Sequence, residues 1–166
     1  MPLSSLLLAS LALAAPPAEA LRDRDQPIEI EAQRTEGNLR DTGVTVLSGE
    51  VRIRQGSLSI LADRAEIHRE GTQVGQVRLQ GSPVRLEQAL PDRSGTLIAE
   101  ARSIDYDPER RRMILEGNVR IVEPRGELKG SRVEYDTETG RVRADGGRDA
   151  PVRIRIDPPA VPPAAA

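Results

Sequence analysis

The residues of this chain best suited to catalysis are two pairs of carboxylates. Asp105 and Asp107 form the first pair, Glu134 and Asp136 form the second, and the members of each pair flank a tyrosine. Two neighbouring carboxylates could act as general acid and base, as they do in glycosidases. Both pairs, however, lie at the same position of a repeat and lead into predicted turns, where Asp is favoured because it bonds to backbone N–H groups. The pattern therefore favours a structural role, and we predict no catalytic residue.

His68 is the only histidine of the chain, and there is no cysteine. The residues after His68 lead into a glycine turn, and no set of further ligands gathers around it as a metal site requires. The sequence also lacks a Gly-x-Ser-x-Gly nucleophile motif and a phosphate-binding loop. We therefore predict that the protein is not an enzyme, and we expect it to use no metal and no cofactor.

The composition excludes nucleic acid as a natural partner and restricts the core. The chain has 24 Lys and Arg residues against 26 Asp and Glu residues, a formal net charge of −2. Such a balanced surface lacks the basic field that attracts a polyanion. The chain has no Phe, no Trp and only two Tyr. Its core must therefore consist of Val, Ile, Leu and Ala, whose thin side chains would line a groove without filling it.

The elements that must position these residues are strands, because apolar residues recur at every second position. The pattern Leu-x-Gly-x-Val-x-Ile begins at Leu47 and returns at Leu115, and a third copy that begins at Leu79 has a longer insertion. Alternation with a period of two is typical of strands with one buried face and one exposed face. Each copy therefore predicts an antiparallel hairpin, and the insertion in the third copy predicts a longer hairpin loop.

The second half of each copy contains a slip in this alternation. After Ala62, Ala101 and Gly130 the next apolar residue comes three positions later rather than two. A β-bulge or a bend produces such a slip. No segment shows a helical period, so we predict an all-β chain of bent hairpins. The predicted strands are 27–32, 45–54, 57–62, 65–69, 74–80, 83–88, 96–102, 103–107, 112–117, 118–123, 127–130, 132–136, 140–144 and 151–157.

Three segments are expected along the chain. An apolar run from Leu6 to Ala15 is followed by Ala18-Glu19-Ala20, which is typical of a signal peptide, although no Lys or Arg precedes the run. We expect residues 1–20 to be a signal peptide cleaved near Ala20, so the mature protein should be exported. Residues 21–157 form the predicted β-domain. Residues 158–166 are rich in Pro and Ala, and we expect them to be disordered.

The first and last predicted strands carry opposite charges. Glu29 and Glu31 decorate the first strand, whereas Arg153 and Arg155 decorate the last. If both strands lie at open sheet edges, the last strand of one molecule could pair with the first strand of another. The same charges could equally be ordinary solvated side chains that protect the edges from aggregation. The sequence leaves these two interpretations open.

Seven short motifs follow one another along residues 27–156. They are Pro27-Ile28-x-Ile30-x-Ala32, Leu47-x-Gly49-Glu50-Val51-x-Ile53-x-Gln55-Gly56, Ala62-Asp63, Gly81-Ser82-Pro83-Val84, Tyr106-Asp107, Leu115-x-Gly117-Asn118-Val119 and Gly130-x-x-Val133-x-Tyr135-Asp136. Taken in order, they resemble the OstA-like family of periplasmic lipopolysaccharide-transport proteins of Gram-negative bacteria. This chain departs from the family in having Glu50 where Asn is common.

The resemblance implies a fold and a function. The fold is a twisted, V-shaped β-jellyroll of antiparallel strands with an open apolar groove. The function is to bind the acyl chains of lipopolysaccharide and to carry it from the inner to the outer membrane within a head-to-tail protein bridge. The implied partners are lipopolysaccharide, an inner-membrane LptC-like component, the N-terminal domain of an outer-membrane LptD-like component, and further copies of this chain. The alternative is a periplasmic scaffold that polymerises through its edge strands and binds no lipid.

The candidate groove residues are the aliphatic residues at inward positions of the predicted strands. They are Ile28, Ile30, Val51, Ile53, Leu58, Ile60, Ile67, Leu79, Val84, Leu86, Ile104, Val119, Ile121, Val133, Ile154 and Ile156.

Overall fold

The strands of this chain pair into one antiparallel sheet. The computed structural model describes residues 25–37, 42–71, 73–90, 95–148 and 150–158. The predicted signal peptide and residues 159–166 of the predicted tail lie outside them. The described strands are β1 (Glu29–Glu31), β2 (Arg34–Gly37), β3 (Gly43–Gln55), β4 (Leu58–Glu70), β5 (Gln73–Ala89), β6 (Thr96–Asp107), β7 (Arg112–Glu123), β8 (Gly126–Asp136), β9 (Val142–Asp145) and β10 (Arg153–Ile156). Among the described residues, no helix has the length and apolar character needed to cross a membrane.

The long strands follow one another across the sheet in sequence order. The order is β1-β3-β4-β5-β6-β7-β8-β10, while β2 pairs with the other half of β3 and β9 pairs with the other half of β8. Tight turns of two residues join β3 to β4 and β7 to β8, whereas six residues separate β5 from β6. The longer loop predicted for the third copy of the repeat is therefore confirmed.

Every long strand carries an irregularity near its middle, and these irregularities line up across the sheet. The pairing register shifts around residues 49–50 of β3, 63 of β4, 81–83 of β5, 102 of β6, 117–118 of β7 and 131 of β8. The slips predicted after Ala62, Ala101 and Gly130 belong to this set. A bulge bends a strand locally, so a row of bulges creases the whole sheet.

The sequence-based strand boundaries were wrong in two respects. Each strand from β4 to β8 was predicted as two separate strands, such as 57–62 and 65–69 for β4. Each of them is a single strand, because a bulge bends the backbone without ending its pairing. Residues 34–37 were not predicted as a strand. β2 has no apolar alternation and is fully exposed, and its pairing with β3 is what defines it.

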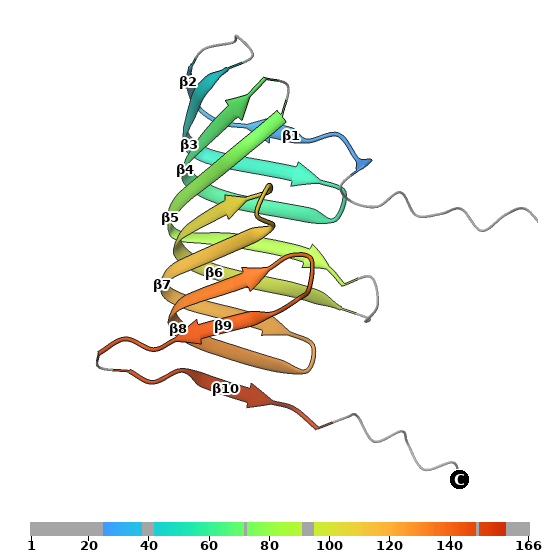
Figure 1. Cartoon of the computed structure of the whole chain (residues 1–166), viewed down its shortest axis with the longest axis vertical. Helices are drawn as coiled ribbons and strands as arrows, with labels where there is room; N and C mark the ends of the chain where they lie inside the picture. Colours follow the sequence, from blue (N-terminus) through green and yellow to red (C-terminus); the bar gives the residue numbers. More distant parts are fainter. Residues whose placement is uncertain (1–24, 38–41, 72, 91–94, 149, 159–166) are drawn as a thin grey trace, which may run out of the picture.

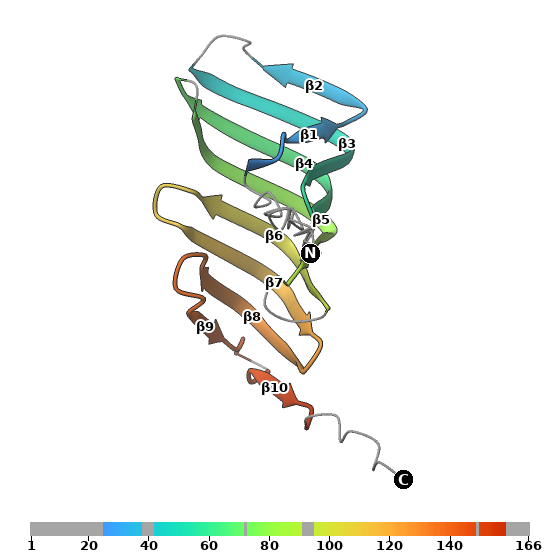
Figure 2. The same ribbon diagram turned by 90° about the vertical axis from the view of Figure 1, so that its right-hand side faces the viewer.

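The crease divides the sheet into two arms. We call residues 51–62, 84–101 and 119–130, with β1 and β10, the first arm. We call residues 43–48, 64–80, 103–116 and 132–136, with β2 and β9, the second arm. Figure 1 shows the strands bending at the left of the view while the two arms diverge to the right. Figure 2, turned to face the opening, shows the strands stacked from β2 to β10 along the long axis.

The hydrophobic core lies between the arms. Its buried side chains are Leu47, Val51, Ile53, Ile60, Ala62, Ala65, Ile67, Leu79, Val84, Leu86, Ala99, Ala101, Ile104, Leu115, Val119 and Val133. No polar or charged residue is buried among the described residues. The opposite faces of both arms carry cross-strand ion pairs, such as Arg85 with Glu100 at 2.6 Å and Arg78 with Asp105 at 2.7 Å. The alternation in the sequence therefore separates an apolar interior from a charged exterior.

The bulges of β3 and β7 require unusual backbone angles. Gly49 and Glu50 have φ values of 78° and 47°, and Gly117 and Asn118 have φ values of 81° and 51°. A side chain with a Cβ is strained in this left-handed region, and Asn tolerates it better than most residues. Glu50 therefore occupies a position for which Asn is the better residue.

We predict that Glu50→Asn stabilises the protein by up to about 1 kcal/mol, because Asn relieves part of the left-handed strain. Urea unfolding followed by circular dichroism would measure this change. The matched control is Asn118→Glu, which places the less tolerant residue in the equivalent bulge and should destabilise the fold by a similar amount. Equal stabilities for all three proteins would contradict this account.

Candidate functional site

The interior of the first arm carries a continuous row of apolar residues. Cross-strand pairing aligns them from one edge of the sheet to the other. The row is Ile30, Ile53, Ile60, Leu86, Ala99, Ile121, Leu128 and Ile154. Because directly opposed side chains on one face are neighbours, the row forms an unbroken aliphatic surface along the long axis of the molecule.

The second arm carries a matching row on its inner face. It consists of Thr35, Leu47, Ala65, Leu79, Ile104, Leu115, Val133 and Ala144. From Leu47 to Val133 every member is at most 5% exposed. The two arms therefore present cross-strand rows of the same length, and the second row is aliphatic from Leu47 to Ala144 but ends in the exposed Thr35. The side chains closest to the crease are closed off from water.

Burial decreases from the crease towards the opening of the V. On the first arm Val51 and Val84, beside the crease, are 1% and 0% exposed. Leu58, Leu97 and Leu128, further out, are only partly buried against the core. The apolar interior thus changes gradually from a dry core at the crease to an accessible aliphatic surface at the opening.

The structure places the candidate groove residues on this inner face in two groups. Twelve of them, Val51, Ile53, Leu58, Ile60, Ile67, Leu79, Val84, Leu86, Ile104, Val119, Ile121 and Val133, belong to the core or pack against it. The other four lie at the two ends of the stack and are exposed. They are Ile28 (52%), Ile30 (42%), Ile154 (65%) and Ile156 (78%). The role of all sixteen in lipid binding stays a prediction.

Sequence reasoning missed a row at the opening of the second arm. Tyr106, Met113 and Tyr135 are directly opposed on β6, β7 and β8, and all three are partly exposed. They include both aromatic residues of the chain. A tyrosine has an apolar ring and a polar hydroxyl, so this row provides a boundary between the aliphatic interior and water. The shared position of the two tyrosines in the repeat is the signal that could have revealed it.

The carboxylates considered for catalysis are held by structural contacts. Asp105 pairs with Arg78 at 2.7 Å, and Glu134 lies 3.8 Å from Arg112. Asp107 accepts hydrogen bonds from the backbone N–H of Arg110 at 2.9 Å and from its guanidinium at 2.8 Å. These bonds lower the pKa of Asp107, the backbone bond contributing most. A general acid needs the opposite shift, so Asp107 is not suited to that role.

Asp136 has the same structural role in the turn between β8 and β9. Its carboxylate accepts hydrogen bonds from the backbone N–H groups of Thr139 at 2.8 Å and Glu138 at 2.9 Å. These bonds, the one from Thr139 first, lower the pKa of Asp136. The neighbouring Thr137 N–H donates to the backbone oxygen of Arg111 at 2.8 Å, which ties this turn to the one before β7. The structural role predicted from the recurring position is in keeping with this geometry.

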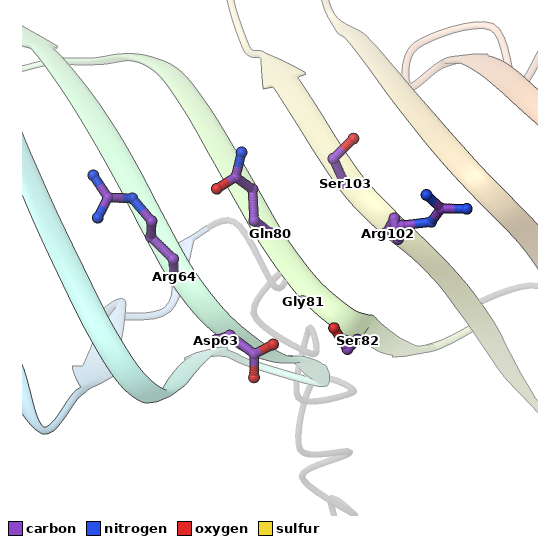
Figure 3. Close-up of a pocket in the computed structure, with 7 residues that line it drawn as sticks. All are labelled: Asp63, Arg64, Gln80, Gly81, Ser82, Arg102 and Ser103. Carbon is purple, nitrogen blue, oxygen red and sulfur yellow. The ribbon is translucent and has the colours of Figure 1, made fainter.

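The polar pocket at the crease contains no catalytic arrangement. It is lined by Asp63, Arg64, Gln80, Gly81, Ser82, Arg102 and Ser103. Figure 3 shows the side chains of Arg64 and Arg102 pointing away from each other, and Arg64 is engaged by Glu66 at 2.9 Å. His68 lies on the outer face of β4 opposite Val44. Among the described residues no three His, Cys, Asp or Glu side chains gather where they could hold a metal.

The amino-acid sequence of this chain matches a known protein family. Residues 29–141 match the family model described as LptA/(LptD N-terminal domain) LPS transport protein. The chain belongs to this family. The family resemblance inferred from the sequence motifs is thereby confirmed.

Relatives of the LptA family cover nearly the whole chain. The lipopolysaccharide export system protein LptH of Pseudomonas aeruginosa is 29% identical over 160 residues, which are 93% of this chain and 87% of LptH. LptA of Haemophilus influenzae is 29% identical over 157 residues, 92% of this chain and 90% of that protein. LptA of Escherichia coli K12 is 28% identical over 145 residues, 86% of this chain and 77% of that protein.

A solved structure establishes the fold. The crystal structure of Pseudomonas aeruginosa LptH, described as the LptA homologous periplasmic component of the conserved lipopolysaccharide transport device, superposes with a TM-score of 0.71 at 24% identity. The match covers 82% of this chain and 99% of that chain. The all-β jellyroll expected from the sequence is therefore confirmed.

The hydrogen bonds of Asp136 predict that the folded protein loses stability as the pH falls into the acidic range. The pKa of Asp136 is lowered in the folded protein. The contribution of its ionised carboxylate to the free energy of unfolding is therefore fully present above the unfolded pKa of about 4, and it is lost as the pH falls through the folded pKa. Asp136→Asn keeps an acceptor but removes the charge, so the variant should be less stable than the natural protein at pH 7. The difference should disappear towards pH 2.5. Urea unfolding across this pH range would measure it.

The control for this prediction is Asp63→Asn. Asp63 is exposed and forms no hydrogen bond with another described residue. Its substitution should leave the stability unchanged at every pH. A loss at pH 7 for Asp136→Asn that persists unchanged at pH 2.5 would show that the charge of Asp136 is not responsible.

Proposed function

We propose that this protein is a periplasmic carrier whose apolar interior receives the acyl chains of lipopolysaccharide and which transfers lipopolysaccharide from the inner to the outer membrane. The observation that carries the proposal is the pair of inner cross-strand rows, aliphatic along the whole sheet on the first arm and from β3 to β9 on the second. Membership of the LPS transport family supports it. The relatives named as lipopolysaccharide export proteins support it as well. The proposed role is transport, and it requires no catalytic residue.

The physical basis is the cost of exposing acyl chains to water. Burying one methylene is worth about 0.8 kcal/mol, so a twelve-carbon chain is worth about 10 kcal/mol as an upper estimate. A lipid cannot cross an aqueous compartment at a useful rate against such a cost. An aliphatic surface that continues along the molecule lets the chains slide between similar surroundings, so no single step has to overcome the whole amount.

The proposed surroundings of the carrier follow from the family. We propose that it acts in the periplasm, between an inner-membrane LptC-like component and the N-terminal domain of an outer-membrane LptD-like component, with copies of itself joined head to tail. In this proposal residues 1–20 are a signal peptide removed near Ala20, residues 21–157 are the carrier domain, and residues 158–166 are a disordered tail. The family model includes both LptA and the LptD N-terminal domain, which supports a shared fold along the bridge.

A second candidate function is a scaffold that polymerises without lipid. The observation in its favour is that β1 and β10 each have a single neighbour in the sheet, with Glu29 and Glu31 on one and Arg153 and Arg155 on the other. Open edges of opposite charge suit end-to-end pairing. A lipid bound in the interior distinguishes the carrier from this scaffold.

Photo-crosslinking in living cells tests the carrier directly. A photoreactive amino acid at Ile60 or Ile121, on the inner face of the first arm, should yield a lipopolysaccharide adduct. The matched control is Leu61, which is adjacent to Ile60 on β4 but 45% exposed on the outer face. Leu61 should yield no adduct. Absence of an adduct at both inward positions in a folded, exported protein would favour the scaffold.

We further predict that Ile121→Glu weakens lipopolysaccharide binding by tenfold or more, because it places a charge in the aliphatic row where a chain must lie. Val122→Glu is the control, since Val122 is the next residue of β7 and pairs with Ile98 on the other face. Binding to the purified proteins can be measured by displacement of a dye that fluoresces in apolar sites. Equal losses for both variants, with equal melting temperatures, would contradict the proposed location.

A further inference from the structure

Both tyrosines of the chain lie on the lining of the apolar interior. They belong to a further cross-strand row of the second arm, one step closer to the opening than the row that begins at Thr35. The row is Thr45, Ile67, Val77, Tyr106, Met113, Tyr135 and Val142. Because Ile67, Val77 and Met113 belong to the core or pack against it, the whole row faces the interior.

Each tyrosine occupies the last inward position of its strand. β6 ends at Asp107 and β8 ends at Asp136, in each case one residue after the tyrosine. Both aspartates accept hydrogen bonds from backbone N–H groups of the turns that follow. The repeated Tyr-Asp pair therefore divides two tasks between neighbours. The aspartate fixes the turn, and the fixed turn holds the tyrosine where the interior meets water.

The hydroxyl groups of Tyr106 and Tyr135 are accessible to a bound molecule. Neither hydroxyl forms a hydrogen bond with another described residue. Both side chains are only partly exposed, yet the described residues include no buried side-chain oxygen that lacks a hydrogen-bond partner. The two hydroxyl oxygens are therefore not buried. A tyrosine hydroxyl donates one hydrogen bond and can also accept, so each can bond to a molecule outside the chain.

The charged side chains around these tyrosines balance one another within the chain. The ion pairs are Arg110 with Asp107 at 2.8 Å, Arg111 with Glu138, and Arg112 with Glu134 at 3.8 Å. The pKa of Asp136 is lowered chiefly by its backbone hydrogen bonds, and the nearby charge of Arg141 adds to this shift. An anionic group at this rim would therefore meet arginines that already have carboxylate partners. The hydroxyls, and not a basic patch, are what this rim offers to a ligand.

Hydroxyl donors at this level suit the chemistry of an acyl chain. Every acyl chain is joined to its headgroup through the carbonyl of an ester or an amide, so an acceptor stands where the apolar chain ends. A carbonyl buried without a donor is costly, and a donor at the same depth removes that cost. Ile67 and Val77, in the same row on β4 and β5, cannot donate. The part of the opening formed by β6 to β8 is therefore suited to the polar end of an acyl chain.

We propose that Tyr106 and Tyr135 bind acyl carbonyls of lipopolysaccharide at the boundary of the interior, so that the chains lie between the arms and the headgroup lies outside. This inference rests on the proposed function and deepens it. Neighbouring strands are about 4.8 Å apart, so the tyrosines on β6 and β8 are about 10 Å apart, with Met113 between them. A hydroxyl hydrogen bond spans only about 2.7 Å. The two hydroxyls therefore bind different carbonyls, and the rim selects a lipid that carries several acyl chains on one headgroup.

Substitution by phenylalanine tests the hydroxyls alone, because phenylalanine keeps the ring. Tyr106→Phe and Tyr135→Phe should each weaken the binding of lipid A by about fivefold, and the double variant by about 25-fold, since separate hydrogen bonds contribute independently. Binding can be measured by displacement of an apolar dye that has no ester or amide group. The dye itself should bind the natural protein and all variants equally. The melting temperature should not change, because neither hydroxyl bonds within the chain.

Two controls separate the hydroxyls from their surroundings. Met113→Leu changes the side chain between the tyrosines but removes no hydrogen-bond donor, so lipid A should bind as before. Lipid A from which the phosphate groups have been removed should bind nearly as well as intact lipid A. The affinity for intact lipid A should change little between low and high salt, because the arginines of the rim are already paired.

Each outcome bears on a different part of the proposal. Equal affinity of the natural protein and the double variant for lipid A would overturn the inference and leave the carrier function in place. Single variants that lose as much affinity as the double variant would show one shared partner and overturn the selection of two carbonyls. A large loss on removal of the phosphates would assign recognition to the arginines instead. Failure of the natural protein to bind lipid A would overturn the carrier function itself, and this inference with it.

Discussion

The structure depends on the alignment of backbone bulges along one line of the sheet. Each of the six long strands leaves one to three residues out of the pairing at this line, and the extra residues of neighbouring strands face each other. A sheet of short aliphatic side chains could not otherwise fold onto itself, because its twist alone does not bring two halves of one face together. The crease does this in every strand, and it allows Val51 of one arm and Leu47 of the other to become buried on the same strand.

The same crease explains why the interior remains partly open. Side chains close to it are in contact with both arms, whereas those near the strand ends face a widening gap, and the core contains no aromatic ring large enough to close it. Tyr106 and Tyr135 lie at this opening, and both are partly exposed. The protein thus obtains stability from the residues nearest the crease and leaves its outer aliphatic residues available to a ligand. In the proposed function, folding and lipid binding would use neighbouring parts of one apolar surface.

Continuity along the long axis links the interior to the ends of the molecule. Each inner row passes from edge to edge, so the residues that would hold lipid also determine how a further copy would have to align. The exposed Ile30 and Ile154 are the ends of one such row. Their exposure is unfavourable for an isolated molecule and would be relieved by a neighbour whose row continues the same surface. Transport through a chain of proteins requires this property, because a break in the aliphatic surface would expose acyl chains to water.

Much of this architecture is already determined by the sequence. The period of two predicts strands, the slips after Ala62, Ala101 and Gly130 predict bulges, and the motifs around Leu47 and Leu115 identify the family, because local backbone pairing and side-chain alternation follow from neighbouring residues. The sequence did not reveal that two predicted strands form one bent strand, or that residues 34–37 pair with β3 and residues 142–145 with β8 across from them. These features depend on which distant residues become neighbours across the sheet. Only the tertiary structure decides that, since cross-strand register is set by the whole ladder of pairings and not by the composition of any one segment.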